Sequence, residues 1–255
     1  MAEARLRFRD ATLTHPGKVR SDNEDCVLAR PDAGLWLVAD GMGGHANGEW
    51  ASAVIAAALN GALLPDDFDA AGEATAQAIH AANRRIWSES KAIGASMGST
   101  AVALLLRGSR FAVFWAGDSR CYLFRAGVLH QLTTDHSQVQ DMVAAGRLTP
   151  EEAEGHPMAH VLSRAVGVEP ELQVDAISDE ALVDDIFLIC SDGLTRTVPD
   201  GELAMLLGDG RPASIADRLI ALSLERGAPD NVSVVVVGCD AATLLTVAPG
   251  ALSLS

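Results

Sequence analysis

Apolar residues along this chain fall into two kinds of stretch, which are short unbroken or alternating runs and longer runs at helical spacing. The short runs, bounded by Gly, Pro, Asp and Asn, predict β-strands, and the longer runs predict helices. Strands are predicted over residues 11–15, 25–29, 35–39, 99–106, 111–116, 120–124, 128–132, 172–177, 186–190 and 232–238. Helices are predicted over residues 48–64, 70–90, 137–155, 200–207 and 213–225, the first capped by Asn47 and ended by Pro65.

The order of these elements predicts the fold class. Strands follow one another in a meander between paired helical blocks, rather than alternating one by one with helices. That order favours antiparallel sheets with helices outside, an α+β layered sandwich, over a doubly wound parallel sheet. No repeat of fixed period and no linker rich in Pro, Gly or Ser divides the chain. We therefore predict one domain over residues 1–240, followed by a short C-terminal tail, 241–255.

The charge balance narrows the classes of partner. The 255 residues carry 19 Lys and Arg against 34 Asp and Glu, a formal net charge of −15. Such a chain repels phosphate backbones and anionic lipids, so neither nucleic acid nor membrane is an expected partner. No apolar run approaches the ~20 residues of a membrane span and no leader-like segment opens the chain, which predicts a soluble, cytoplasmic protein. Four widely spaced cysteines form no C-x-x-C pair and are expected as reduced thiols in apolar strands.

Acidic residues recur where the predicted strands end or begin. They are Asp40, Asp118, Asp192 and Asp230, with Glu24 in the segment that leads into the strand at residue 25. One such Asp beside Gly or Asn is ordinary turn chemistry. A sheet, however, gathers strand ends at one edge, so several of these carboxylates can converge there. Because an uncompensated cluster would repel itself, the pattern points to a bound divalent cation.

Ligand chemistry indicates the class of metal and of substrate. An oxygen-only set of Asp and Glu suits Mg²⁺ or Mn²⁺ rather than zinc or copper. Two such ions about 3.5–4 Å apart lower the pKa of a bridging water and orient it toward phosphorus. Arg20 is the candidate for gripping substrate phosphate, because a guanidinium binds phosphate oxygens bidentately. The glycine-rich run 41–48 departs from G-x-G-x-x-G, and its glycines are interpreted as letting backbone approach a metal closely.

Six ordered motifs resemble one family. They are R-S-D-N-E-D at residues 20–25, V-A-D-G-M-G-G-H at 38–45, G-S-T at 98–100, A-G-D-S-R at 116–120, C-S-D-G-L at 190–194 and P-D-N-V-S at 229–233. Together they resemble the metal-dependent protein phosphatases of type 2C, and within them the single-domain bacterial serine/threonine branch. The resemblance runs from Thr14 to Val237. It implies a four-layer α/β/β/α sandwich of two antiparallel sheets flanked by helix pairs, with the metal site in a cleft at one edge.

The resemblance also implies roles for the matched residues. Asp40 would bridge two Mn²⁺ or Mg²⁺ ions, and the Gly41 carbonyl would bind the second of them. Asp192 and Asp230 would hold the first ion, and Glu24 would reach the second through water. The implied reaction is direct attack of a metal-activated bridging water on phosphoserine or phosphothreonine, without a phosphoenzyme.

Further matched positions concern a third ion, the substrate and the leaving group. Asp118, with Asp192, resembles the site of a weaker third ion in bacterial members, and Arg20 resembles the substrate-phosphate clamp. Eukaryotic relatives carry a histidine, proposed as the general acid, where this chain has Met42, which cannot donate a proton. A metal-bound water is the first candidate for that proton and His45 the second, and a purely structural His45 at the helix start stays open.

Residues 137–164 correspond to the family's variable flap beside the active site. His136, His156 and His160 lie in or near it. The spacing H-x-x-x-H of the last two is interrupted by Pro157 and lacks a third ligand, which favours a solvated flap over a zinc site. The flap is therefore expected to shape which phosphopeptides enter.

Two alternatives to an active phosphatase stay open at this point. One is a catalytically dead relative that serves as a binding or regulatory module, and the other is a hydrolase of small phosphate esters. The presence of every matched ligand favours an active enzyme. Its expected partners are phosphoprotein substrates and a cognate serine/threonine kinase, with a monomer as the expected state because no sustained heptad occurs.

Overall fold

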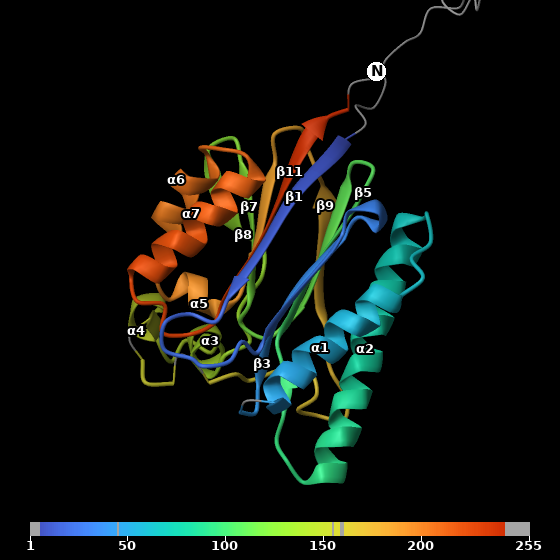
Figure 1. Ribbon diagram of the computed structural model, residues 1–255, viewed down its shortest axis with the longest axis vertical. Helices are drawn as coiled ribbons and strands as arrows, with labels where there is room; N and C mark the ends of the chain where they lie inside the picture. The colour runs from blue at the N-terminus through green and yellow to red at the C-terminus, as the bar shows by residue number, and fades with distance from the viewer. Residues whose placement is uncertain (1–5, 45, 155, 159–160, 243–255) are drawn as a thin grey trace, which may run out of the picture.

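Two antiparallel β-sheets lie face to face with helices on both outer sides (Figure 1). This computed structural model describes residues 6–44, 46–154, 156–158 and 161–242. The first sheet consists, in spatial order, of β1 (Leu6–His15), β11 (Val232–Ala241), β10 (Ile186–Cys190), β7 (Arg120–Arg125) and β8 (Val128–Gln131). The second consists of β2 (Asp25–Arg30), β3 (Leu35–Met42), β5 (Ala101–Arg107), β6 (Arg110–Ala116) and β9 (Asp175–Glu180), with β4 (Gly98–Ser99) paired to β3.

Helices cover the outer face of each sheet. The second sheet is covered by α1 (Ala46–Gly61) and α2 (Phe68–Ile93), and the first by α5 (Asp192–Thr195), α6 (Asp200–Leu207) and α7 (Pro212–Glu225). A 3₁₀ turn, η1 (Pro31–Ala33), joins β2 to β3, and α3 (Gln138–Ala144) and α4 (Pro150–Glu154) lie in the segment expected as a flap. Buried apolar side chains form three clusters. One lies between the second sheet and helices α1 and α2, one between the two sheets, and one between the first sheet and helices α5, α6 and α7. The predicted four-layer α/β/β/α sandwich is confirmed.

Strand β3 shows why its sequence is an unbroken apolar run. Leu35, Leu37 and Ala39 point into the core shared with the helices, while Trp36 and Val38 point into the core between the sheets. Successive side chains of a strand point to opposite faces, and here both faces are covered, so no polar position is tolerated. The strand is thereby clamped on both sides, and the acidic residue that follows Ala39 has a fixed position.

The element boundaries differ from the predicted ones where local pattern and tertiary pairing disagree. Strand β3 continues to Met42, so Asp40 and Gly41 belong to the strand, because β2 and β4 pair with it there. Strand β9 runs over 175–180 rather than 172–177, because its partners on β6 are residues 110–115. The first helix begins at Ala46, so Asn47 lies within its first turn and is not its cap.

Two other sequence expectations, the helix over 137–155 and the boundary at residue 240, agree with the structure only in part, whereas the expectation for the cysteines is confirmed. The predicted helix over 137–155 is two short helices, α3 and α4. The domain boundary at residue 240 falls inside β11, which includes Ala241, and the expected tail lies outside the described residues from 243 on. The four cysteines are free thiols. No helix within the described ranges is both long and apolar enough to cross a membrane.

Shortening a buried side chain of β3 tests whether the apolar layer between the second sheet and its helices stabilises the fold. Leu37 is fully buried there, so Leu37→Ala leaves a cavity and is expected to cost about 2–5 kcal/mol of unfolding free energy, measured by urea denaturation. Leu63, whose side chain is 92% exposed, is the control, and Leu63→Ala is expected to stay within about 0.5 kcal/mol of the parent. Equal losses in the two variants would contradict the layered core described above.

Candidate metal centre and active site

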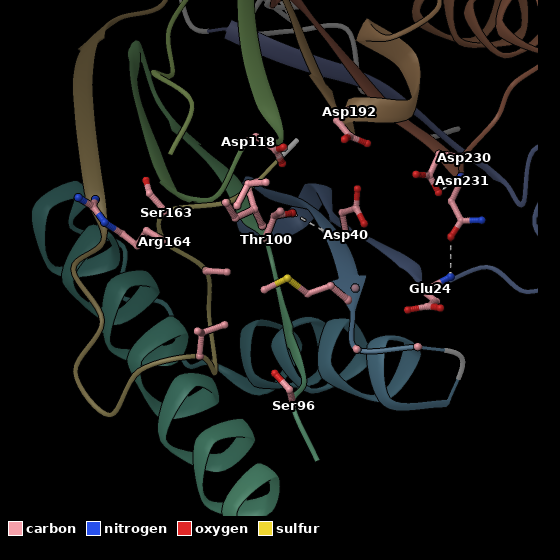
Figure 2. A pocket seen from close by; sticks show the side chains of 18 of the residues that line it. Glu24, Asp40, Ser96, Thr100, Asp118, Ser163, Arg164, Asp192, Asp230 and Asn231 are labelled. Atoms are coloured by element: carbon pink, nitrogen blue, oxygen red, sulfur yellow. Dashed lines mark hydrogen bonds between the residues drawn. The ribbon is translucent and has the colours of Figure 1, made fainter. Parts of the chain in front are cut away.

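The acidic residues at the strand ends line one cavity of about 890 Å³ at an edge of the sandwich (Figure 2). Each comes from a different part of the chain. They are Glu24 before β2, Asp40 near the end of β3, Asp118 in the turn between β6 and β7, Asp192 at the start of α5, and Asp230 before β11. Gly41, Met42 and Arg20 line the same cavity. The predicted convergence of these residues is therefore found in the structure, except for His45, which lies outside the described residues.

Thr100 ties Asp40 to the turn that carries Asp118. The Asp40 backbone N–H donates to Oγ1 of Thr100 at 3.0 Å, and the Thr100 N–H donates to the Asp40 carbonyl at 2.8 Å (Figure 2). The same hydroxyl lies 2.7 Å from the Ser119 hydroxyl. Gly117 has φ +117°, and a Cβ there would lie 2.6 Å from Cβ of Thr100, so only glycine permits this close approach.

Asn231 performs the same task for the loop that carries Arg20 and Glu24. Its side-chain oxygen accepts the Glu24 backbone N–H at 2.8 Å (Figure 2). Its amide nitrogen donates to the carbonyls of Pro16 and Asp22, both at 2.9 Å. One buried amide thus holds both ends of the loop against the start of β11, beside Asp230.

Glu24 itself lies against the first turn of α1. A Cβ on Gly48 would be 1.8 Å from the Glu24 carboxylate, so glycine at this position makes room for that carboxylate. A Cβ on Gly41 would meet the Gly48 carbonyl at 2.2 Å and the Glu24 carbonyl at 2.6 Å. The glycine-rich run therefore brings three backbone segments together beside the carboxylates, which agrees with the close-approach interpretation of these glycines.

The carboxylates of the cavity repel one another, and the nearby arginines offset only part of their charge. Burial, followed by repulsion from Asp25 and Asp192, raises the pKa of Asp40 well above its usual range. Burial and the charge of Asp192 raise the pKa of Asp118 to about 7. Burial also raises the pKa of Asp25, the first residue of β2, to about 6. Like charges this close favour the neutral acids unless a cation joins them.

The residues fit a divalent cation in donor chemistry and in charge. Every donor is a carboxylate or a backbone carbonyl, the set that Mg²⁺ and Mn²⁺ prefer. One oxygen of the buried Asp25 has no hydrogen-bond partner, although the other accepts from Ser191 at 2.8 Å and from Ser233 at 2.7 Å. As the side chains stand, no three acidic, histidine or cysteine residues in the described part of the chain are arranged to hold an ion.

Arg20 and Arg196, two of the arginines that line the cavity, form ion pairs with its carboxylates. Arg20 donates from Nη2 to one oxygen of Asp230 at 3.1 Å, and its Nε lies 3.0 Å from the other oxygen in an ion pair. These contacts raise the pKa of Arg20. Arg196 donates to Asp230 at 2.9 Å and forms a second ion pair with Asp192. Arg20 was predicted from the sequence and Arg196 was not, although the i, i+4 spacing between Asp192 and Arg196 was a visible signal.

Arg164, at the end of the flap segment, lines the cavity. His136 links this end of the flap to the turn at Gly117. Nδ1 of His136 accepts the Gly117 backbone N–H at 3.1 Å, and Nε2 lies 3.1 Å from the Asp175 carboxylate. Arg164 donates to the same carboxylate at 2.8 Å. Burial lowers the pKa of His136. His136 therefore joins the flap to the turn that precedes Asp118, and a role in metal binding is not needed to explain it.

The other flap histidines add less. Nδ1 of His156 accepts the Met158 backbone N–H at 3.2 Å, so this nitrogen is already used in a local turn. His160 lies outside the described residues, and the expectation of a flap without zinc stays a prediction.

Comparison with known proteins places this site in a family context. A family model described as Protein phosphatase 2C matches residues 8–142. The serine/threonine protein phosphatase PstP of Mycobacterium tuberculosis is 43% identical over 92% of this chain, which spans only 46% of that relative's length. The serine/threonine phosphatase stp of Listeria monocytogenes is 35% identical over 89% of this chain and 94% of its own.

Solved structures agree with these matches. PppA, described as a key regulatory component of T6SS in Pseudomonas aeruginosa, has a TM-score of 0.86 and 41% identity, covering 91% of this chain and 97% of its own. The catalytic domain of PstP, solved in complex with two manganese ions, has a TM-score of 0.80 and 38% identity, covering 92% and 99%.

The raised pKa of Asp118 predicts a pH dependence of stability in EDTA. The folded pKa, about 7, exceeds the usual value, so the folded state holds this proton longer than the unfolded state and stability falls as pH rises from about 4 to 7. Asp118→Asn is therefore expected to stabilise the metal-free protein, and more at pH 7.5 than at pH 5 by on the order of 2 kcal/mol, measured by urea denaturation.

The exposed Asp217→Asn, on α7, is the control and is expected to have little effect at either pH. A stabilisation by Asp118→Asn that is the same at both pH values would contradict the account of repulsion within the cluster.

Proposed function

The chain belongs to the protein phosphatase 2C family, and on that premise we propose that it is a metal-dependent protein serine/threonine phosphatase. The observation that carries the proposal is the convergence, at one cavity, of acidic residues from five separate segments of the chain. A phosphate monoester is an anionic substrate, and an acidic cavity accepts one only when cations are present. The names of PstP and stp, both serine/threonine phosphatases, support the choice of phosphoproteins as substrates.

We propose Mn²⁺ or Mg²⁺ as the metal, in two sites. Asp40 would contribute to both sites, with Asp192 and Asp230 in the first and the Gly41 carbonyl and Glu24 in the second. Asp118, with Asp192, would serve a weaker third site. When bound, such ions lower the pKa of a water between them and polarise the phosphoryl oxygens, so that this water attacks phosphorus directly. The two manganese ions in the solved PstP catalytic domain support the choice of metal and the number of main sites.

Other side chains would bind the substrate phosphate, protonate the leaving group and contact the substrate protein. Arg20, whose side chain is 56% exposed at the cavity, would bind substrate phosphate when it leaves Asp230. Met42 carries no proton to give, so we propose that water in the cavity protonates the leaving seryl or threonyl oxygen, with His45 as the alternative donor. The last residues of the flap, 161–164, line the cavity together with Ala165 and Val168 and would contact the substrate protein.

The finer expectations belong to the same proposal. A phosphatase of this class implies a serine/threonine kinase that supplies its phosphoproteins and therefore a role in signalling. We propose that it acts as a monomer in the cytoplasm, in keeping with the strongly acidic surface implied by the net charge of −15.

Metal dependence is tested by phosphate release from a phosphothreonine peptide, with Mn²⁺ titrated in after EDTA stripping. Release is expected only with metal, and Asp192→Asn, which removes a ligand charge, is expected to lower it at least about 100-fold at saturating Mn²⁺. Asp217→Asn is the matched control and should keep parental activity. Near-normal turnover by Asp192→Asn would contradict the ligand assignment, and no release at any Mn²⁺ concentration would favour a binding module. Faster turnover of small phosphate esters than of phosphopeptides would contradict the substrate class.

The role of Arg20 is tested by the same steady-state assay. Arg20→Ala removes phosphate binding present in both ground and transition states, so KM is expected to rise about 10- to 100-fold while kcat changes little. Arg20→Lys keeps the charge but loses the bidentate fork, and should lie between the two. A normal KM with a lowered kcat would instead assign Arg20 to stabilisation of the transition state.

A further inference from the structure

Arg196 bridges two of the residues assigned to the first metal ion. It follows Asp192 by four residues across the single turn of α5, and its Nη2 forms an ion pair with that carboxylate. Its Nη1 lies 2.9 Å from the Asp230 carboxylate at the start of β11. The side chains of Asp192 and Asp230 are 13% and 20% exposed, whereas the contact between Arg196 and Asp230 remains open to water.

We propose that Arg196 is a resident counter-charge of the metal centre that competes with divalent ions for Asp192 and Asp230 and so sets how tightly the centre binds metal. The inference rests on the proposed function only in taking these carboxylates as metal ligands. Arg196 acts through them and touches no reacting atom, so it is a positioning residue.

The contacts of the Asp230 carboxylate support competition between Arg196 and a divalent ion. A carboxylate accepts about four hydrogen bonds. One oxygen of Asp230 accepts the Asn231 backbone N–H at 3.0 Å and lies 3.0 Å from Nε of Arg20 in an ion pair. The other accepts from Nη2 of Arg20 at 3.1 Å and from Arg196 at 2.9 Å. Three of about four acceptor positions are therefore taken and a guanidinium lies against each oxygen, so an ion that binds Asp230 competes with arginine for the same carboxylate.

The charge of Arg196 adds to this steric competition. A guanidinium held between two carboxylates supplies the positive charge that an ion would otherwise bring, and it repels an ion that approaches the same oxygens. Its field extends to Asp118, where it lowers the pKa against the burial and the repulsion that raise it. The metal-free cluster is thereby stabilised, and the binding free energy of an entering ion becomes less favourable.

The test measures Mn²⁺ affinity directly, without substrate. Parent, Arg196→Gln, Arg196→Lys and the control Arg218→Gln are stripped with EDTA, dialysed and titrated with Mn²⁺ in a calorimeter. Arg218 forms an exposed pair with Asp209 at 3.1 Å, away from the cavity, so its loss should leave the Kd unchanged. Arg196→Gln is expected to tighten the Kd for Mn²⁺ roughly tenfold, and Arg196→Lys, which keeps the charge, should remain closer to the parent.

Thermal unfolding separates competition from a merely structural role. Arg196→Gln is expected to lower the Tm in EDTA, because the carboxylates lose their counter-charge, and to show a larger rise of Tm on adding Mn²⁺ than the parent. An unchanged or weaker Kd for Mn²⁺ in Arg196→Gln overturns the proposal. Equal losses of Tm in EDTA and in Mn²⁺ also overturn it, since they would show a structural role alone.

The outcome is independent of the phosphatase assignment. Phosphate release from the phosphothreonine peptide is measured in parallel on the parent protein. A parent that binds Mn²⁺ more weakly than Arg196→Gln, yet releases no phosphate, supports the role of Arg196 and contradicts only the proposed function.

Discussion

Mutual repulsion between carboxylates is the constraint on which the functional end of this protein depends. Strands and turns hold Asp40, Asp118 and Asp192 in one cavity, where their side chains cannot turn out into solvent. Burial raises the pKa of Asp40 and of Asp118. Such an arrangement is costly for a protein whose net stability is only ~5–15 kcal/mol. It persists because the fold positions the acids more strongly than repulsion can separate them, and because cations offset the charge.

The rigidity comes from the layers beneath the site. Strand β3 is buried on both faces, so its end, with Asp40, is held by two apolar cores. Cross-links made by Thr100 and Asn231 then fix the remaining segments to one another through backbone hydrogen bonds. The apolar layers of the sandwich therefore supply the stability, whereas repulsion between carboxylates at the charged edge opposes it. The backbone around the site is therefore fixed, whereas the acidic side chains still have to turn toward an ion, because as they stand no three of the described residues are arranged to hold one.

Much of the fold was predictable because its signals are local. Ten strand segments follow from apolar runs, and the acids at their ends stand beside Gly or Asn in plain view. The contacts that complete the site were not predictable in the same way. Asn231 meets Glu24 across 207 positions, and no local pattern encodes that pairing. The shift of β9 has a similar origin, since its register is chosen by β6 rather than by its own composition. Arg196 was the exception, because its spacing from Asp192 is visible but has an ordinary helical explanation.

The central claim is that divalent ions lie between the acidic strand ends. The most direct measurement is the anomalous difference density of manganese in crystals of the protein grown with Mn²⁺. The account predicts two strong peaks in the cavity of Figure 2, with Asp40 between them, Asp192 and Asp230 beside one peak, and Arg196 withdrawn from Asp230. An empty cavity with both arginines still paired to Asp230, or manganese bound only elsewhere on the surface, would contradict it.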